Sequence, residues 1–160
     1  MAKVIMTCGK LCSGKSTYAR SLAGENGAVI LSVDEITLAV FRNEAGDMLD
    51  EYVRRIQGYL YGKSLEIAAA GTYVILDWGF WTSSEREYAR SFYRQHGISC
   101  ELHYLDITDE LWKQRIAVRN QLVSSGEVSA YYVDNGLEEK FAGIFQPPDE
   151  SEIDKRIIIR

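Results

Sequence analysis

The feature that most constrains the fold is the stretch Gly-Lys-Leu-Cys-Ser-Gly-Lys-Ser-Thr at residues 9–17, which directly follows an apolar run at residues 4–6. Its pattern is G-x-x-x-x-G-K-S. Gly9 and Gly14 let the backbone curl so that successive N–H groups point inward, at the oxygens of a polyphosphate. A helix has to begin near Lys15, where its positive end favours an anion. The flanking signals favour a phosphate-binding loop over an ordinary glycine-rich turn.

The side chains of this loop have separate expected roles. Lys15 is expected between the β- and γ-phosphates of a nucleoside triphosphate, and the Ser16 hydroxyl is expected on a magnesium ion. The remaining predicted nucleotide-binding residues are Gly9, Cys12, Ser13, Gly14 and Thr17. ATP and Mg²⁺ are the expected cofactors, and the sequence has no N-K-x-D motif of the kind that recognises guanine.

Length and charge limit the class of protein. The chain of 160 residues predicts one domain over residues 1–160. Its net charge of −5 argues against a nucleic-acid-binding surface, although a local basic cleft is compatible with it. No apolar stretch approaches the roughly 20 residues of a membrane span. No signal peptide precedes the first strand, so we expect a cytoplasmic protein with no membrane partner. No motif fixes its oligomeric state.

The cysteines carry little chemical signal. Cys8, Cys12 and Cys100 have no metal-ligand spacing. A disulfide between Cys8 and Cys12 would disturb the phosphate loop, so reduced thiols are expected. A redox-sensitive Cys12 is the alternative.

Apolar runs alternate with helical patterns along the chain, which is typical of an α/β domain with a parallel sheet. Strands are expected at residues 3–7, 28–32, 72–76, 100–106 and 156–159. Helices are expected at residues 15–23, 35–41, 47–70, 83–96, from the cap Thr108 through Arg119, and 135–145, with a mobile loop at 121–130. The wholly apolar third strand predicts the centre of the sheet. The pattern predicts a three-layer P-loop fold, a five-stranded parallel sheet flanked by helices.

Ligands bind at the carboxyl ends of the strands in such sheets, and Asp34, Asp77 and Asp106 fall at or just beyond three of these ends. Asp77 is predicted to hold the magnesium ion, a water in its shell or the substrate. Its alternative role is to cap the turn after the strand. Asp34 is predicted to orient an acceptor hydroxyl and take its proton, or else to be the N-cap of the following helix.

Two arginines are candidates for binding the transferring phosphoryl group. Arg115 and Arg119 are four residues apart, so they share one helix face just before the loop at 121–130. They are predicted to close over the phosphoryl group, in a lid around residues 115–133. The alternative is a solvated face that pairs with Asp109 or Glu110. A second stripe is expected to be solvent-exposed, and it consists of Arg86, Arg90 and Arg94.

Aromatic residues follow the third strand. Trp78 and Trp81, with Phe80, are predicted to line a pocket for the acceptor, and at least one of the three is expected in the core. His96 and His103 have no partner at catalytic spacing. The segment Gln-Pro-Pro at residues 146–148 is expected either to form a wall beside the adenine or simply to stop a helix.

These motifs together resemble the predicted ATP-dependent kinases of the P-loop class, an AAA-type kinase family related to polynucleotide kinase and chloramphenicol phosphotransferase. The resemblance spans nearly the whole chain and rests on residues 9–17, 32–35, 74–81, 111–120 and 145–150. It implies that Asp34 is the general base and that Arg115 and Arg119 are the arginine pair that enters the lid. The acidic balance and the lack of an obvious basic funnel depart from polynucleotide kinases.

The predicted function is transfer of the γ-phosphate of Mg-ATP to a hydroxyl of an antibiotic-, nucleoside- or sugar-like small molecule. Lys15, Asp34, Arg115 and Arg119 are its predicted catalytic residues. The predicted acceptor contacts are Asp34, Asp77, Trp78 and Trp81, and the predicted metal ligands are Ser16 and Asp77. Two alternatives stay open: a polynucleotide 5′-hydroxyl kinase, and a nucleotide-operated regulatory ATPase.

Overall fold

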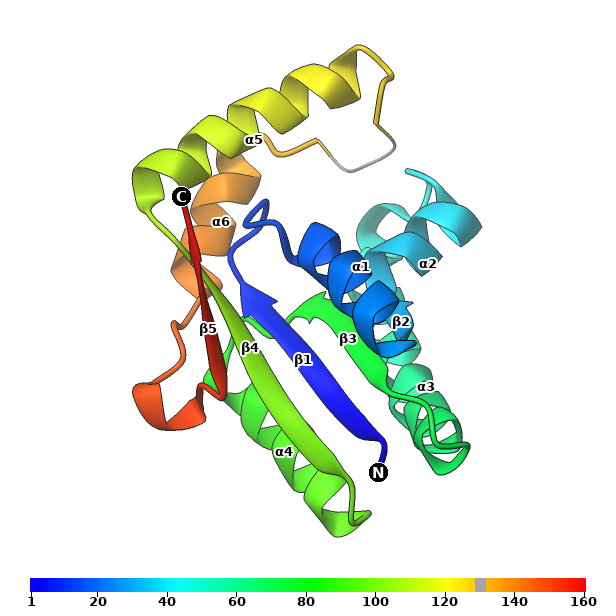
Figure 1. The fold of residues 1–160 in the computed structure, drawn as a ribbon. Coiled ribbons are helices and arrows are strands. Elements are labelled where there is room, and N and C mark those ends of the chain that lie inside the picture. The colour runs from blue at the N-terminus through cyan, green and yellow to red at the C-terminus, as the bar shows by residue number, and fades with distance from the viewer. Residues whose placement is uncertain (129–131) are drawn as a thin grey trace.

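The computed structural model describes residues 1–128 and 132–160 and contains a five-stranded sheet whose strands all run parallel (Figure 1). The strands are β1 (Lys3–Gly9), β2 (Val29–Ser32), β3 (Val74–Gly79), β4 (Ser99–Ile107) and β5 (Lys155–Ile159). Their order across the sheet is β2-β3-β1-β4-β5. The predicted α/β P-loop fold class is therefore confirmed.

Helices cover both faces of this sheet. They are α1 (Lys15–Asn26), α2 (Val33–Phe41), α3 (Leu49–Ala69), α4 (Ser83–Gln95), α5 (Asp109–Ser124) and α6 (Asn135–Ile144), with short 3₁₀ helices η1 (Gly46–Met48) and η2 (Glu150–Glu152). Ile5 and Ile75 pack against Ala19 and Leu22 of α1. The residues on the opposite face pack against α3 and α4, and they include Val4, Met6, Val74, Leu76 and Leu102. The alternation of side chains along each strand thus produces the three layers.

The centre of the sheet differs from the prediction. β1 is the central strand, and β3 lies between β1 and β2. Both strands are covered by helices on their two faces, so both are almost wholly apolar. Because burial makes the two strands look alike, composition could not tell which one is central.

Two element boundaries also differ from the prediction. Helix α1 continues past Gly24 to Asn26, because Gly27 adopts the left-handed conformation (φ 62°) and donates its N–H to the Ala23 carbonyl. Helix α5 continues to Ser124, so the first four residues of the predicted mobile loop at 121–130 are helical. Residues 129–130 of that loop, and residue 131, lie outside the described part of the chain.

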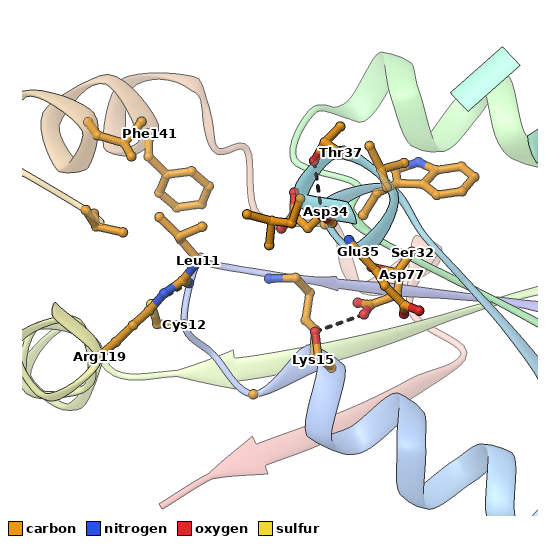
Figure 2. A pocket seen from close by; sticks show the side chains of 18 of the residues that line it. Leu11, Cys12, Lys15, Ser32, Asp34, Glu35, Thr37, Asp77, Arg119 and Phe141 are labelled. Atoms are coloured by element: carbon orange, nitrogen blue, oxygen red, sulfur yellow. Dashed lines mark hydrogen bonds between the residues drawn. The ribbon is translucent and has the colours of Figure 1, made fainter. Parts of the chain in front are cut away.

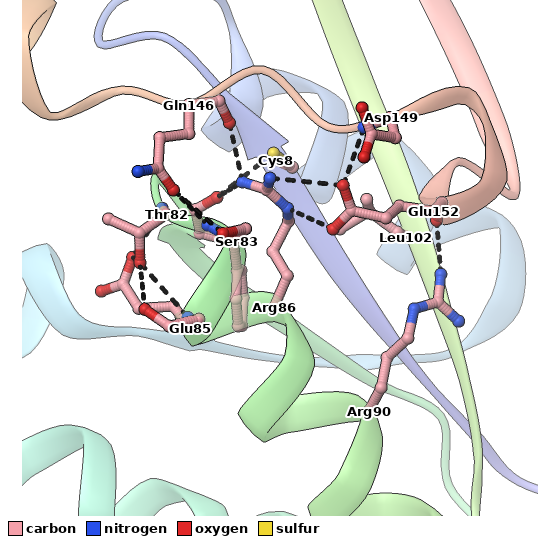
Figure 3. A network of polar contacts seen from close by, with 12 residues as sticks. Cys8, Thr82, Ser83, Glu85, Arg86, Arg90, Leu102, Gln146, Asp149 and Glu152 are labelled. Carbon is pink, nitrogen blue, oxygen red and sulfur yellow. Dashed lines mark hydrogen bonds and ion pairs between the residues drawn. The ribbon is translucent and has the colours of Figure 1, made fainter.

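The predicted solvent-exposed arginine stripe is wrong for its first member. Arg86 is 1% exposed, and its guanidinium pairs with the Glu152 carboxylate at 2.8 Å (Figure 3). It also donates to the main-chain carbonyls of Phe80 and Gln146, at 3.0 and 2.9 Å. The segment that leads into β5 folds over this face of α4 and supplies the Gln146 carbonyl and the Glu152 carboxylate. With the Phe80 carbonyl they offset the cost of burying the charge.

Strand register brings the carboxyl ends of three strands together. Ser32 of β2 pairs with Asp77 of β3, and Cys8 of β1 lies opposite Gly79 of β3. The loop at residues 9–16, the start of α2 and the end of β3 therefore meet at one edge of the sheet. None of the helices in the described residues combines the length and the apolar character that a membrane span requires.

Candidate active site

The phosphate loop connects β1 to α1 in the conformation that its glycines allow. Gly14 precedes α1 with φ 99°, a value that side chains rarely tolerate. A Cβ on Gly9 would lie 2.9 Å from the Leu105 carbonyl oxygen, so the close approach of β1 to β4 also requires glycine there. The loop is therefore shaped before any ligand binds.

Lys15 folds back over this loop. Its ammonium donates to the carbonyl oxygens of Gly9 and Lys10, at 3.1 and 2.7 Å. Burial lowers the pKa of this ammonium group, although the nearby Asp77 carboxylate opposes the shift. The hydrogen bonds of the Lys15 ammonium thus go to neutral carbonyl oxygens, and a phosphate group in the loop would offer it charged acceptors.

A hydroxyl and a carboxylate face each other at the start of α1. The Ser16 hydroxyl donates to Asp77 at 2.9 Å, and the Thr7 hydroxyl lies 3.3 Å from the other carboxylate oxygen. Asp77 is 7% exposed. Its side chain therefore faces Ser16 across the end of the sheet rather than capping the turn that follows β3, which is the alternative that the sequence left open.

Asp34 is not the N-cap of α2. The N-cap is Ser32, whose hydroxyl accepts a hydrogen bond from the Glu35 N–H at 3.2 Å. This leaves the Asp34 carboxyl group one residue inside the helix, where it opens into the cleft (Figure 2). Asp34 is exposed to the open cleft. The protein atoms around its carboxyl group still displace water from it and raise its pKa, and the positive charges of Lys15 and Arg119 partly oppose that rise.

The arginine pair of α5 contacts the phosphate loop. Arg115 donates to the Ser13 carbonyl and Arg119 to the Cys12 sulfur, both at 3.1 Å. Asp109 forms an ion pair with Lys10 instead. The alternative of a solvated face paired with Asp109 or Glu110 is therefore wrong, because both arginines contact the loop.

Sequence reasoning missed Trp112 as a positioning residue. Its indole N–H donates to the Leu11 carbonyl at 2.6 Å, and its ring lies 5.0 Å from the Lys10 ammonium. Trp112 is buried one turn before Arg115, so it anchors α5 on the loop. The signal was present in the spacing, because residues three apart share a helix face.

A cleft of about 1580 Å³ connects these groups. Trp78 and Trp81 line it, whereas Phe80 is fully buried in the core, in agreement with the expectation that at least one aromatic residue belongs there. The Trp81 indole nitrogen is buried without a hydrogen-bond partner in the described part of the chain. Gly79 is required beside it, because a Cβ there would lie 2.3 Å from that nitrogen.

Other residues singled out in the sequence lie away from this cleft. Helix α6 ends at Ile144, and Gln146 accepts from the Ser83 N–H at 2.8 Å, so residues 146–148 anchor the chain and do not line the cleft. His103 bridges Tyr18 and Glu101, at 2.8 and 3.1 Å.

The cysteines Cys8, Cys12 and Cys100 are free thiols. Burial raises the pKa of Cys8 to about 12. A redox role for Cys12 stays a prediction.

The loop, its lysine and the serine–aspartate pair define a P-loop nucleotide-binding domain. A family model described as an AAA domain matches residues 4–134, and the chain belongs to this family. The matched range includes every residue assigned to the candidate site. It confirms the resemblance to P-loop proteins that the motifs predict.

Solved structures share this fold over nearly the whole chain. A sugar kinase from Janibacter sp. HTCC2649 is 17% identical, with a TM-score of 0.65 over 99% of this chain and 85% of that one. The APS kinase CysC from Mycobacterium tuberculosis, solved with AMPPNP and APS, is 20% identical, with a TM-score of 0.65 over 98% and 88%. Kti12 from Chaetomium thermophilum, solved with ADP-AlF3, is 14% identical, with a TM-score of 0.71 over 98% and 88%. No curated protein matches the sequence.

Proposed function

We propose that the protein is an ATP-dependent phosphotransferase that moves the γ-phosphate of Mg-ATP to a hydroxyl of a small molecule. One observation carries the proposal: Asp34, Lys15 and Arg119 all line the same cleft, and the charges of the two cations act to lower the pKa of the Asp34 carboxyl group. A carboxylate at this position can face an incoming hydroxyl while the two cations face the transferring phosphoryl group. A protein that only holds a nucleotide needs no such carboxylate.

In the proposed reaction the acceptor hydroxyl lies against Asp34 and gives its proton to the carboxylate. The acceptor oxygen forms a bond to the γ-phosphorus while the bond from that phosphorus to the bridging oxygen breaks, so ADP leaves. Lys15 and the N–H groups of the loop hold the phosphate oxygens. Arg115 and Arg119 stabilise the negative charge that spreads over the transferring group.

The proposed lid begins at the same two arginines. We propose that the segment around residues 115–133 closes over the phosphates. Residues 129–131 of this segment lie outside the described part of the chain. Its described beginning is helical as far as Ser124. Closure would therefore move the end of helix α5 rather than a loop, and Trp112 would stay as the anchor.

Ser16 and Asp77 would hold the magnesium ion. Their hard oxygen donors lie 2.9 Å apart next to the phosphate loop, and Mg²⁺ binds through one or two protein oxygens together with waters and phosphate oxygens. Bound there, the ion would supply positive charge to the β- and γ-phosphates.

The size of the cleft supports two simultaneous ligands. Its volume of about 1580 Å³ exceeds the roughly 300–1,000 Å³ of a typical site for one small molecule. A nucleotide at the loop would leave the part between α2, α3 and the end of β3 for an acceptor. The sugar kinase and the APS kinase that share the fold are also consistent with a small acceptor.

Transfer of radiolabelled γ-phosphate to a panel of antibiotics, nucleosides, sugars and oligonucleotides tests the proposal. We expect transfer to a small hydroxyl compound, and Asp34→Asn is expected to abolish it while ATP still binds. Glu44→Gln is the matched control, because Glu44 is an exposed acid just beyond α2 that does not line the cleft. Wild-type turnover by Asp34→Asn would remove the general-base role.

The same panel separates the two alternatives. Labelling of oligonucleotides alone, with a KM that worsens steeply with salt, would identify a polynucleotide kinase. ATP hydrolysis without transfer to any compound, and unchanged in Asp34→Asn, would identify a nucleotide-operated module.

A further inference from the structure

Charged residues are divided between two walls of the cleft. The cationic residues that line it come from the phosphate loop, α1, α5 and α6, and they are Lys15, Arg20, Arg115, Arg119 and Lys140. The opposite wall is built by α2, α3, the end of β3 and α4. Its charged lining residues are all acidic, and they are Asp34, Glu35, Asp50, Asp77 and Glu85. In the described part of the chain this wall contributes no lysine or arginine to the lining.

The acidic wall is the one that an acceptor has to contact, an assignment that rests on the proposed function. The phosphates occupy the loop beside Lys15, and the acceptor oxygen has to approach Asp34 at the start of α2 (Figure 2). The body of the acceptor then lies between α2, α3 and Trp78. Its charge therefore has to match that of this wall.

Two of the five acids are free to recognise a ligand in addition to Asp34. Asp77 is engaged by Ser16, and Glu85 completes the capping box of α4. The Glu35 carboxylate has no hydrogen bond or ion pair within the described residues. Asp50 lies 4.0 Å from Lys140, and side-chain exposures of 92% and 63% make that pair weak.

The apolar part of the same wall is rigid. Trp78 lines the cleft, its ring stacks on Phe80 with centroids 5.3 Å apart, and the Tyr61 ring meets it edge-on at 5.5 Å. Leu38 and Val53 extend this surface along α2 and α3. An aromatic ring held in this way can pack against an apolar group and can also attract a cation.

We propose that the acceptor is a hydroxylated organic cation, such as an amino alcohol or an amino sugar, and that the negative charges of Glu35 and Asp50 in the cleft lining favour its ammonium group. An acceptor that carries a phosphate or a carboxylate would meet only like charges on this wall, together with the γ-phosphate of ATP itself. The negative charges of this wall would attract a cationic acceptor instead. The protein would therefore select an acceptor by its positive charge and by the packing of its apolar part against the Trp78 ring.

Matched sets of hydroxyl compounds test this proposal. Each set keeps one scaffold and changes its charge: glucosamine, glucose and gluconate; 2-amino-1-phenylethanol, 1-phenylethanol and mandelate. We expect kcat/KM for phosphate transfer to be highest for the amine and lowest for the acid within each scaffold. The preference for the amine should shrink as salt rises, because the acids are exposed to solvent.

A pair of double variants assigns the effect to the proposed residues. Glu35→Gln with Asp50→Asn should raise KM for the amine about three- to tenfold and leave KM for the neutral member unchanged. Glu44→Gln with Asp47→Asn changes the net charge equally at exposed residues that do not line the cleft, and it should change neither. Equal effects of the two double variants would overturn the assignment to Glu35 and Asp50.

The outcomes separate this inference from the proposed function. Faster transfer to the acids, or equal transfer to all three members of a scaffold, would overturn the cationic acceptor and leave the phosphotransferase intact. Absence of transfer to every compound, with ATP turnover unchanged in Asp34→Asn, would overturn both.

Discussion

The Ser16 hydroxyl donates a 2.9 Å hydrogen bond to the Asp77 carboxylate, although the two residues are 61 positions apart in the chain. Ser16 is the second residue of α1, at the end of the phosphate loop, and Asp77 lies near the end of β3, which pairs directly with β1. Thr7 contacts the second oxygen of the same carboxylate. Parallel pairing of β1 and β3 thus brings the Ser16 and Asp77 oxygens together at one edge of the sheet.

Replacing Ser16 is expected to weaken binding of the metal–nucleotide complex. In Ser16→Ala, Asp77 keeps its charge but loses the hydroxyl beside it, so affinity for Mg-ATP should fall about 10- to 100-fold. Affinity for ATP in the presence of a chelator should change little. Isothermal titration with and without Mg²⁺ measures both, and Ser21→Ala, on the exposed side of α1, is the control. Equal losses with and without Mg²⁺ would contradict a metal role.

Arg119 is expected to act in the transition state more than in nucleotide binding. Arg119→Met keeps an unbranched side chain and removes the charge that acts on Asp34 and the N–H group that donates to Cys12. We expect kcat to fall by about 10³ while the dissociation constant of ATP changes only slightly. Lys113→Met makes the same charge change on an exposed side of α5, and rapid-quench kinetics compare the two. A similar loss in Lys113→Met would point to net charge as the cause.

The pH profile should report the Asp34 carboxyl group. Burial raises its pKa, so the base becomes protonated at a higher pH than an ordinary aspartate does. Because only the ionised form accepts the proton, kcat/KM should fall as pH drops through this raised pKa.

Arg119 lowers that pKa, so Arg119→Met should move the acid limb of the profile to still higher pH. A limb at the same pH in wild type and Arg119→Met would mean that another group titrates. If a trace of transfer is measurable in Asp34→Asn, its profile should lack the limb altogether.

The Arg86–Glu152 pair is expected to stabilise the folded state. Glu152→Gln leaves a guanidinium that is 1% exposed without its counter-charge. Since the Glu152 side chain is itself 24% exposed, we expect a loss of roughly 2–3 kcal/mol in the free energy of unfolding, below the range for a fully buried pair. Urea denaturation measures it, with Glu150→Gln as an exposed control. A loss no larger than that of the control would contradict the role of the pair.

The same pair should contribute to acid unfolding. Burial alone would raise the pKa of Glu152, but hydrogen bonds from Arg86 and from the Asp149 N–H outweigh it, so the pKa in the folded protein lies below its ordinary value. The stabilisation is therefore complete above the unfolded-state pKa and is lost as pH falls through the folded-state pKa. Glu152→Gln should flatten this part of the stability profile.

The sequence by itself determined the phosphate loop, the alternation of strands and helices, and the edge at which Lys15, Asp34 and Asp77 gather. Those predictions depend on local chemistry: glycines at a tight turn, apolar runs that must be buried, and carboxylates that follow strand ends. These features do not depend on which distant segments of the chain pack together.

Only the tertiary structure decided which of several possible roles each of these side chains has. Ser32 is the N-cap of α2, so the Asp34 carboxyl group is not needed as a cap and lines the cleft. The arginines of α5 contact the loop, where Trp112 anchors the helix. Arg86 is buried because the segment before β5 covers it. Such outcomes depend on contacts between residues far apart in the chain, and local periodicity carries no information about which distant segment covers a helix face.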